Sequence, residues 1–164
     1  MRSNIFWGLL LIALFAYPSQ LFAQNNNDYE KLEYRKWRVT LIPPISTNGA
    51  RTTDFTAKRS INLIGGYHGA LDGWEIGLLY NSTKYYSAGL QIAGITNYTR
   101  GTMEGLNIAG VANIANESMS GLQVAGALNY SNREIEGLQA TFGVNYSRLS
   151  ISGLQVAGAA NISE

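Results

Sequence analysis

Residues 89–97 read Gly-Leu-Gln-Ile-Ala-Gly-Ile-Thr-Asn, and close copies of this stretch return every 16 residues up to the end of the 164-residue chain. A fixed period of this kind is typical of repeat proteins, so it decides the fold. The copies from residue 89 onward share a first glycine, an amide side chain two residues later and an Asn eight residues after the glycine. These repeat positions are Gly89, Gln91, Asn97, Gly105, Asn107, Asn113, Gly121, Gln123, Asn129, Gly137, Gln139, Asn145, Gly153, Gln155 and Asn161. A weaker copy starts at Gly73.

Within each copy the side chains alternate with a period of two, which predicts β-strands and an all-β fold. In the third full copy, one face carries Leu122, Val124 and Tyr130, and the other carries Gln123, Asn129 and small residues. None of the five ten-residue blocks that begin at the repeat glycines contains Asp, Glu, Lys or Arg. A solvated strand face normally includes charges, so this pattern favours strands that face lipid on one side.

We therefore predict an antiparallel meander closed into a membrane β-barrel of about eight strands, formed by residues 37–164 with repeat copies from residue 73. An even period of 16 does not suit plain hairpins, since same-facing residues would then differ by an odd number. The barrel therefore requires one bulge per copy, which we expect at Gly105, Gly121, Gly137 and Gly153. Met103 and its equivalents would then rejoin the apolar face.

The alternative is a parallel β-solenoid with one coil per repeat. Equivalent Leu, Gln and Asn residues would then stack on one another, and the repeat glycines would form corners. In that arrangement we expect the Gln and Asn face to point outward. The sequence leaves both architectures open.

The chain begins with a pattern typical of an export signal. Arg2 supplies a positive charge, residues 5–16 are apolar, and a polar exit ends at Ala23, so we expect a signal peptide over residues 1–23. Residues 24–36 are polar and predict a spacer. A strand over residues 37–42 is expected to end at the following proline pair, and residues 46–58 predict a loop.

The chemistry-bearing residues predict no catalytic, metal or cofactor site. The chain has no cysteine, and His68 is its single histidine, which excludes a cluster of several histidines. We expect His68 in a turn over residues 67–72, and Asp72 and Glu75 in a solvated loop. A net charge of +1, with one arginine in the expected leader, argues against nucleic acid as a partner.

The GLQxAGxxN repeat, preceded by the segment SINLIGGYHGALDGWEIG (60–77), resembles the bacterial surface repeat-containing proteins over roughly residues 37–164. The resemblance implies an exported, surface-associated protein and carries no known activity. We expect a non-enzymatic outer-membrane or cell-surface protein with a structural or passive-channel role, and a lipid bilayer as its partner. The alternative is a secreted or surface solenoid that acts as a binding or adhesion module for a surface protein or glycan.

Overall fold

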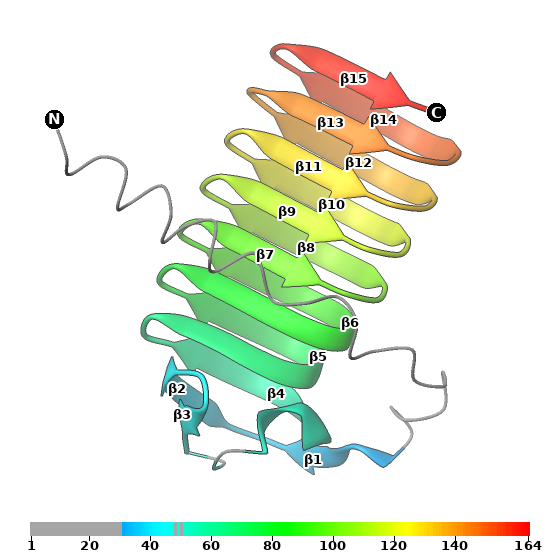
Figure 1. Cartoon of the computed structure of the whole chain (residues 1–164). Helices are drawn as coiled ribbons and strands as arrows, with labels where there is room; N and C mark the ends of the chain where they lie inside the picture. Colours follow the sequence, from blue (N-terminus) through cyan, green and yellow to red (C-terminus); the bar gives the residue numbers. More distant parts are fainter. Residues whose placement is uncertain (1–30, 48, 50) are drawn as a thin grey trace, which may run out of the picture.

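The computed structural model describes residues 31–47, 49 and 51–164, and its repeats wind into a parallel β-solenoid of about seven turns (Figure 1). The expected signal peptide over residues 1–23 lies outside the described residues. The all-β prediction is confirmed, and the architecture is the one that the sequence offered as the alternative.

From Thr96 onward, each coil contains one seven-residue strand and one four-residue strand. The long strands are β8 (Met103–Ala109), β10 (Met119–Ala125), β12 (Ile135–Thr141) and β14 (Ile151–Ala157). The short strands are β7 (Thr96–Thr99), β9 (Ala112–Ala115), β11 (Leu128–Ser131), β13 (Val144–Ser147) and β15 (Ala160–Ser163). Strands of each kind pair in parallel and in register, so that Gly121 lies opposite Gly105 and Gly137. The long and short strands thereby form two facing layers.

The first coils are made by longer strands, β4 (Phe55–Asn62), β5 (Gly65–Gly77) and β6 (Tyr80–Ala93). The beginning of β6 pairs with β7 and its end pairs with β8, so this one strand contributes to both layers. The predicted turn over residues 67–72 is wrong, because β5 continues through it. The predicted loop over residues 46–58 ends earlier, since β4 begins at Phe55.

The N-terminal end of the solenoid is covered by three short strands and one 3-10 helix. β1 (Glu33–Arg35) and β2 (Arg38–Ile42) pair in parallel with β4, β3 (Ile45–Ser46) forms an antiparallel pair with β2, and η3 spans Thr52–Asp54. The strand expected over residues 37–42 is therefore present. β1 lies inside the segment predicted as a spacer, so the paired strands begin before Trp37.

The predicted antiparallel barrel is wrong because the repeated strands pair in parallel with the equivalent strands of the next coil. The chain also turns at Gly110-Val111 and at the equivalent pairs, so each ten-residue block that begins at a repeat glycine is divided between two strands. The expected bulges are corners: Gly105 has φ of +91°, and a Cβ there would lie 2.3 Å from the carbonyl oxygen of Gly89. Met103 is consequently buried instead of rejoining the outward Leu face.

The interior of the coils is narrow and its middle is polar. Gln123 and Asn129 are fully buried between the layers, while Leu122 and Val124 face outward. Small residues such as Ala125 and Ser131 let the layers approach, and Met103, Met119 and Ile135 form an apolar cluster at one side of the interior. The expected outward direction of the Gln and Asn face is therefore wrong, because both layers turn that face inward.

Candidate binding surface

Two rows of amide side chains hold the coils together. In the Asn row, each Nδ2 donates to the Oδ1 of the next coil over 2.8–3.0 Å; the members are Asn62, Asn81, Asn97, Asn113, Asn129, Asn145 and Asn161. Each Nδ2 from Asn81 to Asn145 also donates to a backbone carbonyl, as Asn113 does to Val124 over 2.9 Å. Buried amides are costly unless they are hydrogen-bonded, and the row meets this requirement.

The Gln row is interrupted at one place. Gln155 donates to Gln139 and Gln139 donates to Gln123, each over 2.7 Å. Asn107 occupies the next position, and both polar atoms of its buried side chain have no partner among the described residues. Asn is one carbon shorter than Gln, so it does not reach the row, and the Nε2 of Gln123 contacts the sulfur of Met103 instead.

The first position of the Gln row holds a carboxylate. Glu75 is fully buried and accepts hydrogen bonds from Asn62 over 2.6 Å and from Gln91 over 2.9 Å. Burial raises the pKa of Glu75 to about 7. The expectation that Glu75 lies in a solvated loop is wrong, because β5 carries it into the core.

Glu75 is accompanied by two buried cationic or titratable side chains. Arg38 of β2 is almost fully buried and donates from Nη2 to the carbonyl of Tyr67 over 2.6 Å. Burial lowers the pKa of Arg38 to about 10, and the nearby Glu75 carboxylate opposes this change. His68 is also fully buried, which corrects its expected place in a turn. Its Nδ1 lies 3.3 Å from the Oε1 of Glu75, and burial lowers its pKa to about 3. Arg38, His68 and Glu75 are all shielded from solvent, which fits a structural role better than a reactive one.

The outward side of the long-strand layer is an array of aliphatic side chains. The two rows stand one and three residues after each repeat glycine; they consist of Trp74, Leu90, Leu106, Leu122, Leu138 and Leu154, and of Ile76, Ile92, Ile108, Val124, Ala140 and Val156. The outward side of the short-strand layer carries Tyr98, Ile114, Tyr130, Tyr146 and Ile162 in one row. Both outer faces are thus apolar or aromatic.

One edge of the solenoid is apolar as well. We call it the apolar edge; it is formed by the two-residue turns that join long to short strands, at residues 78–79, 94–95, 110–111, 126–127, 142–143 and 158–159. Phe142 is 88% exposed and Leu78 is 67% exposed. Ile95 and Val111 are exposed as well. The period-two pattern of the sequence places these residues inside strands and so does not reveal this edge; the recurrent Gly at 94, 110, 126 and 158 is the signal that could have revealed it.

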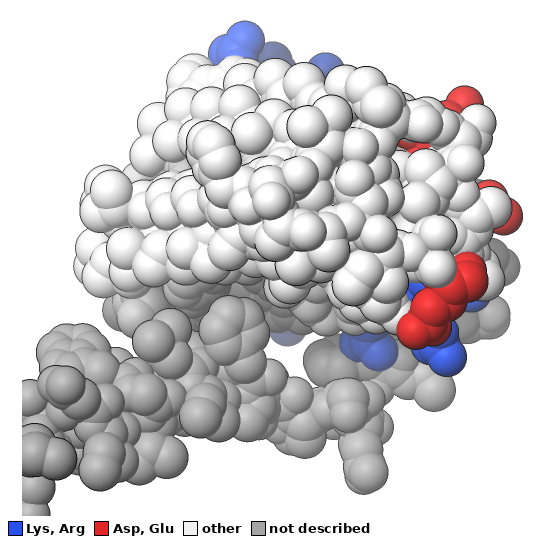
Figure 2. Space-filling model, turned by 90° about the horizontal axis from the view of Figure 1, so that it is seen from above, with Lys and Arg blue, Asp and Glu red and all other residues white. Residues whose placement is uncertain are grey.

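The opposite edge carries the charges. From Gly65 to Glu164, every Lys, Arg, Asp and Glu except Glu75 lies one to five residues before a repeat glycine, or, in the case of Glu164, at the position equivalent to Arg148. These residues are Asp72, Lys84, Arg100, Glu104, Glu117, Arg133, Glu134, Glu136, Arg148 and Glu164. We call these five positions the charged edge. In the view along the solenoid, the acidic atoms gather at one end of the coils, while the opposite end is white (Figure 2).

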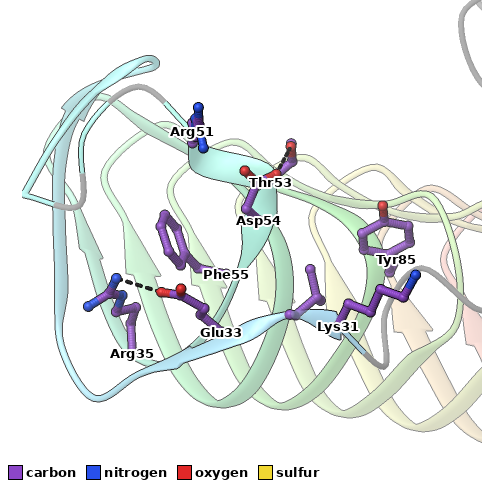
Figure 3. Close-up of a pocket in the computed structure, with 9 residues that line it drawn as sticks. Lys31, Glu33, Arg35, Arg51, Thr53, Asp54, Phe55 and Tyr85 are labelled. Carbon is purple, nitrogen blue, oxygen red and sulfur yellow. Dashed lines mark hydrogen bonds and ion pairs between the residues drawn. The ribbon is translucent and has the colours of Figure 1, made fainter.

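A pocket lies beside the N-terminal strands, and Figure 3 shows charged side chains from β1 and from residues 51–54 around it. Its volume is about 480 Å³. Arg35 forms an ion pair with Glu33 at 2.7 Å and lies 4.7 Å from the centre of the Phe55 ring. These internal contacts engage the arginine, and the Thr53 hydroxyl donates to the Oδ1 of Asp54 over 3.5 Å.

Among the described residues, no group of three or more His, Asp or Glu side chains is placed to hold a metal ion. No helix in that part of the chain has the length and apolar character to cross a membrane.

The repeat positions that the sequence singled out are therefore brought together in the interior and at the corners, whereas the exposed features are the apolar faces and the two contrasting edges. The resemblance to bacterial surface repeat-containing proteins stays a prediction. Comparison with protein-family models, with curated proteins and with solved structures gave no match.

Proposed function

We propose that this chain is a non-catalytic attachment module, exported and held at the cell surface, that binds its partner through the apolar edge and the adjoining outer faces. The observation that carries this proposal is the confinement of surface charge to one edge from Gly65 onward. The remaining edge and the outer faces therefore form a continuous exposed apolar patch, and such patches are a common sign of an interaction surface.

We do not propose a passive channel. It depended on a barrel with a lumen, whereas the coils are filled by side chains such as Gln123, Asn129 and Met119 that have almost no exposed surface. A binding module also agrees with the regular, rigid coil, because rigid surfaces lose little conformational entropy on association.

Fractionation of cells that produce the chain tests the proposal. We expect the protein to sediment with the cell envelope and to be released by mild detergent but not by high salt, since salt weakens charge interactions and leaves apolar contacts intact. Recovery in the soluble fraction, or release by salt alone, would contradict it.

A matched pair of variants identifies the surface. Val111→Lys with Phe142→Lys puts two charges on the apolar edge, and we expect at least tenfold more protein in the soluble fraction. Ser118→Lys with Ser150→Lys puts the same charges on the charged edge and should leave the distribution unchanged. Circular dichroism of both variants confirms that each keeps its β-structure.

A further inference from the structure

The two amide rows inside the coils run in opposite directions. In the Asn row, each Nδ2 donates to the next coil toward the C-terminus, as Asn145 does to Asn161 over 2.9 Å. In the Gln row, each bonded Nε2 donates to the previous coil, as Gln155 does to Gln139 over 2.7 Å. The coil of residues 151–164, which we call the terminal coil, therefore ends one row on a donor and the other row on an acceptor.

Both terminal amides lack contacts that their equivalents make one coil earlier. The Nδ2 of Asn145 has two acceptors in the next coil, the carbonyl of Val156 and the Oδ1 of Asn161. The Nδ2 of Asn161 has only the carbonyl of Gln155, at 3.2 Å, as an acceptor in the described structure. The Oε1 of Gln139 accepts from Gln155, whereas the Oε1 of Gln155 has no donor among the described residues. Asn161 is exposed, although Asn145 is fully buried.

The backbone of the terminal coil is unpaired on the same side. β14 and β15 are the edge strands of the sheet, and each pairs with one described strand alone. One coil earlier, the carbonyls of Thr141 and Ser147 accept from backbone amides of the terminal coil over 3.0 and 3.1 Å. The equivalent carbonyls of Ala157 and Ser163 face no described strand. Proteins commonly protect such edges with charged residues or proline, and the sequences of β14 and β15 contain neither.

The other end of the solenoid is covered. β1 and β2 pair with the edge of β4 that β5 leaves free, and β3 adds to β2, at the end of the molecule opposite β14 and β15 (Figure 1). The side chain of Arg38 in β2 is buried there. A head-to-tail stack of copies is therefore blocked, so association through the terminal coil has to join two like ends. A two-fold axis does this and closes the assembly at two copies.

The directions of the amide rows select one of two two-fold arrangements. If each layer meets its own equivalent, the Asn161 donors oppose each other and the Gln155 acceptors oppose each other. If the long-strand layer of one copy meets the short-strand layer of the other, each Asn161 donor faces a Gln155 acceptor. The axis then runs along the strands, so the apolar edges of both copies stay on the same side.

We propose that two copies of this chain associate through their terminal coils, with β14 of each copy antiparallel to β15 of the other. A single strand from another protein would cover one of the two open edges, whereas a second copy covers both. Asn161 and Gln155 continue the amide rows across the interface. This dimer does not depend on the attachment role, but it joins two apolar edges into one longer surface and so increases avidity for an extended partner.

Sedimentation equilibrium of the full chain, over a series of concentrations, tests the dimer. We expect the mass to rise to twice that of one chain. Asn161→Asp replaces the free donor by a carboxylate opposite an oxygen, at two symmetric places, and should weaken association by about tenfold or more. Ser152→Glu adds the same charge at an exposed position of β14 where the preceding coil carries Glu136, and should leave association unchanged. Circular dichroism checks that both variants keep their β-structure.

Cysteine cross-linking tests the exchange of layers, since the chain has no native cysteine. Oxidation of an equal mixture of Gln155→Cys and Asn161→Cys chains should give the mixed disulfide in excess over random pairing, because those two positions meet across the interface. An excess of the two symmetric disulfides would contradict the exchange.

The remaining outcomes separate the dimer from the attachment role. Single copies at every concentration would overturn the dimer. Association that Asn161→Asp leaves intact would overturn it as well; if Val111→Lys with Phe142→Lys then abolished that association, the copies would meet through the apolar edge. A dimer recovered from the soluble fraction of cells would contradict the attachment role alone.

Discussion

Asn107 shows how a single methylene group controls the polar core. Its neighbours in the row, Gln91 and Gln123, are buried, but the shorter side chain leaves its own two polar atoms without partners in the described structure. An unsatisfied buried polar group costs about 1–3 kcal/mol, so this position is a defect in an otherwise bonded row. The defect separates the Gln contacts near Glu75 from those of the later coils.

Replacing Asn107 by Gln should therefore increase stability. Gln is accommodated at the equivalent positions of the neighbouring coils, and the longer side chain can join Gln91 to Gln123. We expect the free energy of unfolding to rise by about 1 kcal/mol in urea denaturation. The reverse change at an intact position, Gln123→Asn, serves as the control and should lower it. A loss of stability in Asn107→Gln would show that the coil lacks room there.

Glu75 and His68 make opposite contributions to the pH dependence of stability. The pKa of Glu75 is raised from 4.5 to about 7, so its contribution is greatest below pH 4.5 and is lost as the pH rises to 7. The pKa of His68 is lowered from 6.5 to about 3, so its contribution is present above pH 6.5 and is lost as the pH falls to 3. The two slopes oppose each other between pH 4.5 and 6.5.

Removing either group should reveal the slope of the other. In Glu75→Gln we expect the free energy of unfolding to rise with pH between 4.5 and 6.5, relative to the native chain. In His68→Asn we expect it to fall over the same range. Urea denaturation at several pH values measures both. If Glu75→Gln does not fold because Arg38 loses its counter-charge, the slope of His68→Asn alone decides; an unchanged slope there contradicts the assignment.

At the scale of one coil, the repeat glycine is a corner that admits no side chain. Gly121 has φ of +109°, and a Cβ there would lie 2.3 Å from the carbonyl oxygen of Gly105. The backbone conformation and the close approach of the preceding coil both exclude alanine. The same geometry recurs from Gly73 to Gly153, which is why the glycine returns every 16 residues.

Gly121→Ala should consequently destabilise the solenoid by about 3 kcal/mol, from positive-φ strain and the steric contact together. Ser120→Ala, one residue earlier on the charged edge, is the matched control and should change stability by less than about 0.5 kcal/mol. Thermal unfolding followed by circular dichroism measures both. Equal stability of the two variants would contradict the claim that Gly121 forms a corner that admits no side chain.

The strand alternation and the 16-residue period were predictable from sequence, but the inward direction of the Gln and Asn face was not. Aliphatic side chains usually lie inside a protein, but here Leu122 faces outward and Gln123 is buried. Period-two patterns identify two faces without showing which is covered. The burial of Glu75 was also unpredictable, because it depends on Arg38 of β2, which is distant in sequence.

At the scale of the whole molecule, the stacking of identical coils turns a short repeat into extended surfaces. Each coil alone would expose its amides, and the next coil satisfies them, so the polar core and the apolar shell arise together. From Gly65 onward, the same stacking aligns every turn, which gives one edge without charge and one edge with every charged residue of these coils except Glu75. The proposed attachment role follows from this separation of the two edges.

Cross-linking of Glu117→Cys with Arg133→Cys tests the coil stacking most directly. These residues occupy the same position in adjacent coils, where parallel strands lie about 4.8 Å apart, within the range that a disulfide spans. Oxidation of dilute protein should give an intramolecular disulfide, whereas the control Glu117→Cys with Ala127→Cys, on opposite edges, should give none. An antiparallel barrel would put residues 117 and 133 at opposite strand ends, about 30 Å apart. Failure of the 117–133 pair to cross-link in folded protein would contradict the solenoid.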